Sequence, residues 1–134
     1  MKLIVCLDDK NGMLFNKRRQ SSDRAVCGKI LDIAAGKRLL MNAYSGYLFA
    51  EMDGNIHICE DLQSVIREDD ICFVENMEVL PLLAKATELV VFRWNRVYPA
   101  DVHFPELPAA FWIQEKADFT GNSHPQITME VYRR

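Results

Sequence analysis

The sequence lacks the features that mark several large functional classes. No uninterrupted apolar run approaches the roughly 18 to 20 residues of a membrane span, and no basic segment followed by an apolar stretch stands at the N-terminus. The net charge of -3 gives no broad basic field for nucleic-acid phosphates, and no RNP-like, zinc-finger or aromatic stacking motif occurs. We therefore expect a cytoplasmic protein that binds neither nucleic acid nor a membrane.

Paired cysteines are also absent. The four cysteines (Cys6, Cys27, Cys59 and Cys72) form no C-x-x-C pair and mostly lie inside apolar segments, as reduced core cysteines do. His57 and Cys59 share one face of a predicted strand, which could describe part of a metal site. Because neither a third soft ligand nor a coordinating spacing accompanies them, we predict packing roles for the cysteines and no metal site.

Motifs of the common chemistries are missing as well: the sequence has no Walker A loop, G-x-G-x-x-G, G-x-S-x-G or H-E-x-x-H. What the chain does have is 134 residues of which 49% are hydrophobic, enough for one ordinary core. We predict a single domain over residues 1–134.

Short apolar runs alternate with helical patterns over the first two thirds of the chain. The expected strands are 3–7, 39–41, 56–59, 71–74 and 89–92, and the expected helices follow Ser22-Asp23, span 43–51, follow Asp61 and pass through 83–86. Ser22-Asp23 supplies a helix cap and an acid in the first turn, Gly36 a left-handed helix end, and Pro81 lies in a first turn. This alternation predicts parallel crossovers with helices on both sheet faces.

The last forty residues show a different pattern, because no long helix separates their apolar segments. Phe111-Trp112-Ile113 and the strictly alternating segment 127–132 are typical of an antiparallel strand pair. The predicted fold is therefore α/β, with a mostly parallel central sheet extended at one edge by a C-terminal antiparallel hairpin, and with loops over one end of the sheet.

Three polar features could carry chemistry, and each also has a structural explanation. Asp23, after a flexible loop, could face a pocket at the sheet's edge, yet the helix dipole alone stabilises an acid there. The basic run Lys17–Arg19 could attract an anionic ligand or form a solvated loop. Asp101 and His103 lie in a loop where a turn role is the default.

Several segments, read in order, resemble landmarks of dihydrofolate reductase. They are Leu3–Asp8, Gly36-Lys37-x-Leu39-Leu40-Met41, Leu83-x-Lys85-Ala86, Asp101-Val102-His103-Phe104-Pro105 (similar to the family's D-T-H-F-P loop), Trp112, Asn122-Ser123-His124, and the closing Tyr132-Arg133-Arg134. The matches cover nearly the whole chain and agree with the alternation above. The resemblance implies a three-layer, dihydrofolate-reductase-like fold, NADPH as cofactor and a pterin-like substrate.

The resemblance also assigns candidate residues to the ligands. Asp23, the only acid near the family's protonating carboxylate, is the candidate catalytic residue and a substrate contact. Val5 and Cys6 would line the pterin and nicotinamide end through their backbones, and Phe92 stands at a further substrate position. The loop from Gly12 to Gln20 would replace the family's mobile lid, although it lacks the L-P-W signature.

Other positions depart from the family where it binds ligands. The glycine-rich turn beside the cofactor phosphates reads Glu75-Asn76-Met77, and only Ser45 survives of the segment that holds the extra phosphate. A carboxylate at this turn repels pyrophosphate, whereas glycine permits close backbone approach. The arginine for the folate tail falls near Asn55, and Phe92 replaces a hydrogen-bonding threonine.

These observations leave three hypotheses open. The chain is an NADPH-dependent reductase of dihydrofolate or a related pterin, or it is a different reductase on the same scaffold. Alternatively, it is a degenerate member without reductase activity that serves as a small-ligand binding or protein-interaction domain. The oligomeric state is left open.

Overall fold

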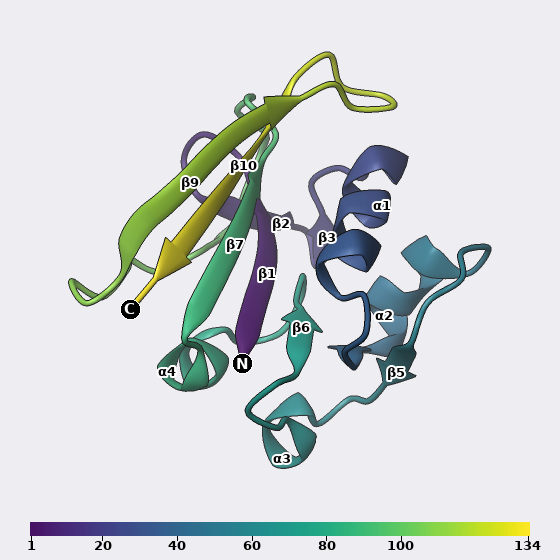
Figure 1. The fold of residues 1–134 in the computed structure, drawn as a ribbon. Coiled ribbons are helices and arrows are strands. Elements are labelled where there is room, and N and C mark those ends of the chain that lie inside the picture. The colour runs from purple at the N-terminus through teal and green to yellow at the C-terminus, as the bar shows by residue number, and fades with distance from the viewer.

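The backbone of the computed structural model, which describes residues 1–134, is organised around a seven-stranded sheet (Figure 1). Its strand order is β5-β4-β6-β1-β7-β10-β9, in which the first five strands are parallel and the last two form an antiparallel hairpin. The bounds are Lys2–Leu7 (β1), Leu39–Met41 (β4), Ile56–Ile58 (β5), Ile71–Phe73 (β6), Glu88–Arg93 (β7), Trp112–Phe119 (β9) and Ile127–Arg133 (β10). The predicted mostly parallel sheet with its C-terminal hairpin is confirmed.

A second, three-stranded sheet was not predicted. It joins β2 (Gly12–Phe15), β3 (Arg18–Arg19) and β8 (Val102–His103) in the order β3-β2-β8. Asn16 and Lys17 form the two-residue turn between β2 and β3 with φ of 55° and 64°, the left-handed values that tight hairpins require. The description of residues 12–20 as a loop was therefore wrong: the segment is mostly a β-hairpin.

The helices are short and follow the predicted alternation. They are α1 (Arg24–Ile33), α2 (Ala43–Gly46), the 3-10 turn η1 (Tyr47–Phe49), α3 (Leu62–Val65) and α4 (Leu80–Lys85). Asp23 is itself the N-cap of α1 and no acid lies in its first turn, which corrects the expectation of an acid there. Gly36 has the predicted left-handed φ of 79° after the helix, and Pro81 lies at the start of α4.

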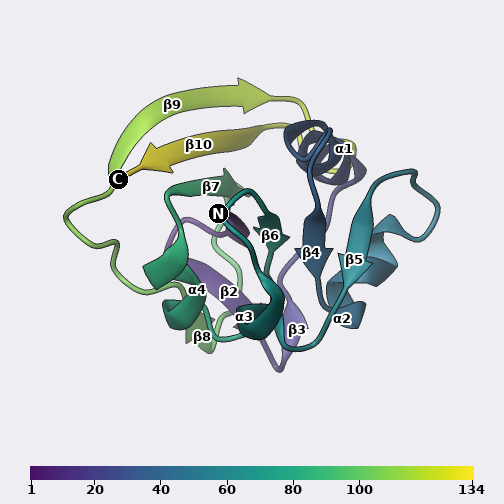
Figure 2. The same cartoon turned by 60° about the horizontal axis from the view of Figure 1, so that its bottom comes forward.

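Two hydrophobic cores lie on opposite faces of the large sheet. Leu3, Val5 and Leu7 of β1 pack with residues of α3, α4 and β2, whereas Ile4 packs with residues of α1 and η1. Figure 2 shows α1 on one side of the sheet and α3, α4 and the small sheet on the other. The alternating side chains of β1 thus hold the three layers together.

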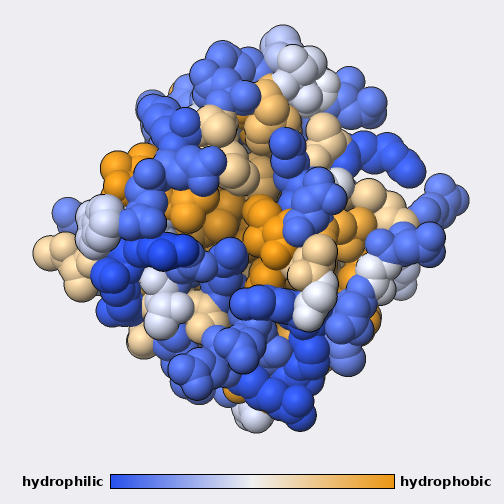
Figure 3. All heavy atoms as spheres, in the orientation of Figure 1, coloured by the Kyte–Doolittle hydropathy of each residue, from blue (hydrophilic) through white to orange (hydrophobic).

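The surface is mostly polar. On the side seen in Figure 1, charged and polar residues surround apolar patches near the centre (Figure 3). None of the helices has the length and apolar character needed to span a membrane.

Candidate ligand-binding site

The carboxyl ends of β1 and β6 form a topological switch point of the sheet. These neighbouring strands pair only along Lys2–Ile4, and the chain leaves β1 through α1 toward β4 but leaves β6 through α4 toward β7. In open α/β sheets, ligands bind where connections diverge in this way. Glu75 follows β6 and Ser45 follows β4, so both stand at this edge.

Glu75 occupies the switch point as a buried carboxylate, 7% exposed. Arg19 of β3 binds it as a two-pronged fork, with Nε–H donating to Oε2 at 2.8 Å and Nη2–H to Oε1 at 3.0 Å. The Ser45 hydroxyl donates to Oε1 at 2.8 Å. Such a bidentate, charge-assisted pair is among the stronger polar contacts in proteins. Although burial alone would lower the pKa of Arg19, its contacts with Glu75 raise that pKa.

Tyr44 fastens the same hairpin to α2. Its hydroxyl accepts the backbone N–H of Arg19 at 2.9 Å, and its carbonyl accepts Nη2–H of Arg19 at 3.1 Å. The guanidinium also lies 4.2 Å from the centre of the Tyr44 ring, a cation–π contact. The segment that the resemblance identifies as a mobile lid is therefore bound across the sheet's edge.

An open cavity of about 530 Å³ lies beside this hairpin. Its lining has two guanidinium groups, two amides and no carboxylate: Phe15, Asn16, Arg18, Arg19, Gln20, Tyr98 and Pro99. Arg18 is exposed and forms no ion pair, whereas Arg19 is paired with Glu75. The cavity therefore presents positive charge on a mainly polar lining with some apolar surface from Phe15 and Pro99, which suits a small anion with an apolar part.

Asp8, at the end of β1, fixes the walls of this cavity. Its carboxylate accepts the N–H groups of Gly12 at 2.7 Å and Tyr98 at 3.1 Å, and the Gln20 amide at 3.0 Å. Burial alone would raise the pKa of Asp8, but these hydrogen bonds lower it. A side chain at Gly12 would meet Gln20 Nε2 at 2.5 Å, so the close approach requires glycine.

Asp23 is fully occupied by protein partners. Its buried carboxylate caps α1 through the N–H of Ala25 at 2.8 Å and accepts the N–H groups of Asn122 at 2.9 Å and Ser123 at 2.8 Å. His124 Nδ1 lies 2.9 Å from Oδ2. Burial would raise the pKa of Asp23, yet the bonds from Asn122, His124, Ser123 and Ala25 hold it well below its usual value. The carboxylate stays ionised.

The other predicted site residues divide between the switch point and the cores. Burial and then the charge of Glu75 raise the pKa of the Cys6 thiol well above its usual value. Asn76 accepts the Asn42 amide at 2.7 Å, while Met77 packs against the core on the α4 side. The side chains of Val5 and Phe92 are buried, at 0% exposure, so only the backbone of either could contact a ligand. Phe92 packs edge-on against Phe119.

Sequence reasoning missed Tyr44, Tyr98 and His124 as contributors to the site. Arg19 and Glu75 are separated by 56 positions, and Asp23 and His124 by 101. The sequence showed only that Arg19 and Glu75 are charged. No local sequence pattern indicates that residues so far apart form a pair.

No family model and no curated protein matches the chain. Among solved structures, the chain is similar to dihydrofolate reductase from Enterococcus faecalis complexed with NADP(H) and RAB-propyl, with a TM-score of 0.70 and 9% sequence identity. The match covers 99% of this chain and 95% of that chain. The chain therefore has a dihydrofolate-reductase-like fold, as the sequence resemblance implied.

Proposed function

We propose that this protein binds a small anion in the cavity beside the β2–β3 hairpin and has no NADPH-dependent reductase activity. One observation carries the proposal: Arg19 and Glu75 pair across the switch point of the sheet. Glu75 stands where the family resemblance places the cofactor phosphates, and Arg19, from the segment that would replace the lid, also forms a wall of the cationic cavity.

The residues at the switch point do not suit a dinucleotide. Glu75 places a carboxylate where phosphates would approach, and like charges in a buried position repel strongly. Arg19, which carries the charge opposite to Glu75, does not replace the missing cofactor ligands, because its guanidinium already donates to Glu75 and Tyr44. Ser45, retained from the family's phosphate segment, also donates to Glu75. A bound dinucleotide would have to displace these contacts.

The cavity has the charge and shape for a smaller ligand. Arg18 offers an unpaired guanidinium, whose planar donors match a carboxylate or a phosphate group. Asn16 and Gln20 add side-chain amides, and Phe15, Tyr98 and Pro99 supply apolar surface. Together they favour an anion that carries a small apolar body.

The second candidate function is an NADPH-dependent reductase of a pterin with Asp23 as the catalytic acid. Its support is that the similar reductase forms a complex with NADP(H). The hydrogen bonds around Asp23 weigh against it, since a saturated, ionised carboxylate has no proton to pass on. Release of Arg19 from Glu75 would also have to precede cofactor binding.

Isothermal titration at low salt tests the proposal with inorganic pyrophosphate, succinate and NADPH as probes. We expect saturable binding of at least one small anion, weakened by salt, and no saturable heat with NADPH at millimolar concentration. Arg18→Ala should weaken anion binding about 5- to 10-fold by removing the free guanidinium.

Arg67→Ala is the matched control, because Arg67 is exposed and lies outside this cavity. It should leave the affinity unchanged. Saturable NADPH binding that pyrophosphate does not displace, with consumption of NADPH on adding dihydrofolate, would support the reductase instead. Failure of every small anion to bind would contradict the proposal.

A further inference from the structure

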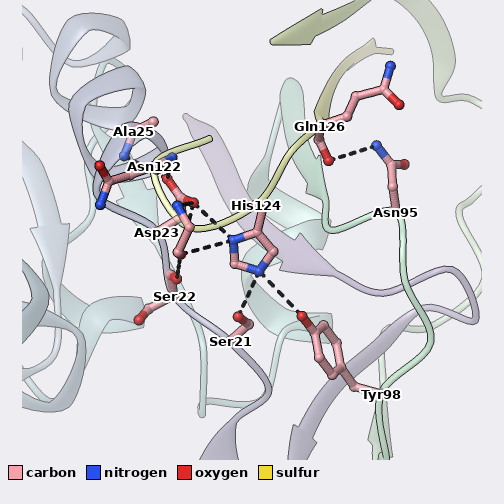
Figure 4. Close-up of polar contacts among 10 residues, drawn as sticks. Ser21, Ser22, Asp23, Ala25, Asn95, Tyr98, Asn122, His124 and Gln126 are labelled. Atoms are coloured by element: carbon pink, nitrogen blue, oxygen red, sulfur yellow. Dashed lines mark hydrogen bonds and ion pairs between the residues drawn. The ribbon is translucent and has the colours of Figure 1, made fainter. Parts of the chain in front are cut away.

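A chain of three hydrogen-bonded side chains lies next to the cavity, in the arrangement of an activated serine (Figure 4). His124 Nδ1 lies 2.9 Å from Oδ2 of Asp23, and its Nε2 lies 2.9 Å from Oγ of Ser21. The Tyr98 hydroxyl lies 3.3 Å from the same Nε2. Serine, imidazole and carboxylate in this order are the parts of a nucleophilic relay.

The hydrogen bonds define where the protons are. Asp23 is ionised and only accepts, so Nδ1 of His124 carries a proton and donates it to Oδ2. This tautomer leaves a lone pair on Nε2, toward which the Ser21 hydroxyl donates. The imidazole is thus oriented as a general base for Ser21.

The ring is held rigidly. His124 is 6% exposed and stacks on Trp94, with ring centres 4.7 Å apart and planes inclined by 26°. The N–H groups of Asn122 and Ser123, which directly precede His124 in the chain, both bind Asp23. Preorganisation of this kind keeps the base in place without further ordering when a substrate arrives.

We propose that Ser21 is a nucleophile for acyl transfer, with His124 as its general base and Asp23 as the residue that orients the imidazole. The similarity to a reductase fold does not supply this activity, and Ser21 is not among the residues that the resemblance assigns to the cofactor or the substrate.

Access and charge indicate the substrate class. Ser21 is half-buried, whereas His124 and Asp23 are buried behind it. Tyr98, which shares Nε2 with Ser21, and Gln20, its chain neighbour, both line the cationic cavity. An ester with a carboxylate on its acyl group would place that charge near Arg18. This preference rests on the proposed anion site, but the nucleophile itself does not.

The backbone N–H of Ser22 offers a donor for the developing oxyanion. It makes no hydrogen bond within the protein, and it directly follows the nucleophile in the chain. The N–H after a nucleophilic serine is a recurrent oxyanion donor in unrelated hydrolases.

The reaction balances with water as the second reactant. Ser21 Oγ bonds to the carbonyl carbon of the ester, its proton passes to His124 Nε2, and the ester C–O bond breaks as the alcohol leaves with that proton. Water then bonds to the acyl carbon and gives a proton to Nε2. The Oγ–C bond breaks, and Ser21 regains its proton as the acid departs.

Burst kinetics with two chromogenic esters test the proposal: neutral p-nitrophenyl acetate and mono-p-nitrophenyl succinate, which adds a carboxylate. We expect a rapid release of about one p-nitrophenol per protein and acylation of the peptide that contains Ser21, located by mass spectrometry. Ser21→Ala should abolish both. His124→Asn should slow acylation at least about 100-fold.

Ser64→Ala is the matched control, because Ser64 is an exposed serine on α3 that bonds only Asp61, and it should leave the burst unchanged. Circular dichroism checks the fold of each variant; Ser21→Ala removes one hydroxyl and its hydrogen bond to His124. A burst that survives Ser21→Ala, or a wild-type protein that neither releases p-nitrophenol nor acquires an acyl group, would overturn the proposal.

The two esters also separate this inference from the anion site. Faster reaction with the succinate ester, reduced by Arg18→Ala, supports both. Equal rates with both esters, unaffected by Arg18→Ala, would support the nucleophile and contradict the anion site. Small-anion binding without any acylation would contradict the nucleophile alone.

Discussion

Asp23 combines three tasks in one carboxylate: it caps α1, anchors the segment at Asn122 and Ser123, and pairs with His124. Ala25 is a close neighbour in the chain, whereas Asn122, Ser123 and His124 form one continuous segment about 100 positions away. An asparagine amide cannot accept all of these hydrogen bonds, because its oxygen accepts but its NH2 group only donates.

We therefore predict that Asp23→Asn lowers the free energy of unfolding by about 2–4 kcal/mol near neutral pH. The folded-state pKa of Asp23 is depressed, so its stabilisation is complete above its unfolded pKa of about 3.9 and is lost as the pH falls through the folded-state value. Urea unfolding of wild type and variant between about pH 7 and pH 3 measures the difference, which should shrink in acid.

Asp53→Asn is the control for this experiment, because Asp53 is exposed and forms no side-chain hydrogen bond. Its effect should stay within about 0.5 kcal/mol at every pH. An Asp23→Asn variant as stable as wild type, or a difference that grows on acidification, would contradict the role assigned to the carboxylate.

The cysteines make a second prediction at the residue scale. Burial raises the pKa of Cys27 to about 11 and that of Cys72 to about 12, so their thiolate fraction at pH 8 falls by about 100-fold or more below that of a free thiol. Cys59 is half-buried on the rim of a core. Timed alkylation with iodoacetamide and peptide mapping should label Cys59 first. Earlier labelling of Cys27 or Cys72 would contradict the packing roles given to them.

The β2–β3 hairpin is the element on which the candidate site depends. It is anchored at its base by Asp8 and across the switch point by Arg19 and Glu75. Loss of one partner leaves a buried charge unpaired, which is costlier than loss of both. A single substitution of Arg19 or Glu75 should therefore destabilise the hairpin more than its small size suggests.

A double-mutant cycle tests this coupling. Arg19→Ala and Glu75→Ala should each destabilise the protein, and the double variant by about 1–3 kcal/mol less than their sum. Hydrogen exchange of residues 12–19 should speed up in Arg19→Ala. The exposed pair of Arg133 and Glu88 gives the comparison: Arg133→Ala should cost no more than about 1 kcal/mol. Additive effects of the Arg19 and Glu75 substitutions would show that the pair does not fasten the hairpin.

The elements that the sequence predicted are those with a local signal. Continuous apolar runs revealed the buried strands, and Gly36 and Pro81 marked helix boundaries. β3 is only two residues long, and the residues of β8 that pair with β2 lie more than eighty positions further along the chain. Neither strand shows a pattern of alternating apolar residues. The small sheet and the anchored hairpin are therefore visible only in the folded structure.

The candidate site was predictable only where a single residue carries a local signal. Asp23 was identified as unusual because it stands at a helix start, but its histidine partner arrives from the last hairpin. The departure at Glu75 and the retained Ser45 were visible as residue types, whereas the bonds of Glu75 to Ser45 and to Arg19 were not. Spacing along the chain carries no information about such distant pairs.

At the scale of the whole molecule, β1 unites the two cores. Leu3 faces the core of α3 and α4, and Ile4 faces the core of α1, although the two residues are adjacent. Neither core can lose β1 and keep its sheet. The prediction of one domain over residues 1–134 therefore has a direct consequence: both cores should unfold together.

We predict that Leu3→Ala and Ile4→Ala each lower the free energy of unfolding by about 2–5 kcal/mol, because each removes a large side chain that is 0% exposed. Fluorescence of the buried Trp94, which belongs to the α1-side core, should change at the same urea concentration as far-ultraviolet circular dichroism in wild type and in both variants. Coincident transitions would mean that the surroundings of Trp94 unfold together with the rest of the chain, even when the substitution, Leu3→Ala, is made in the opposite core. Separate transitions in either variant would instead divide the chain into two units of independent stability, and β1 would then belong to only one of them.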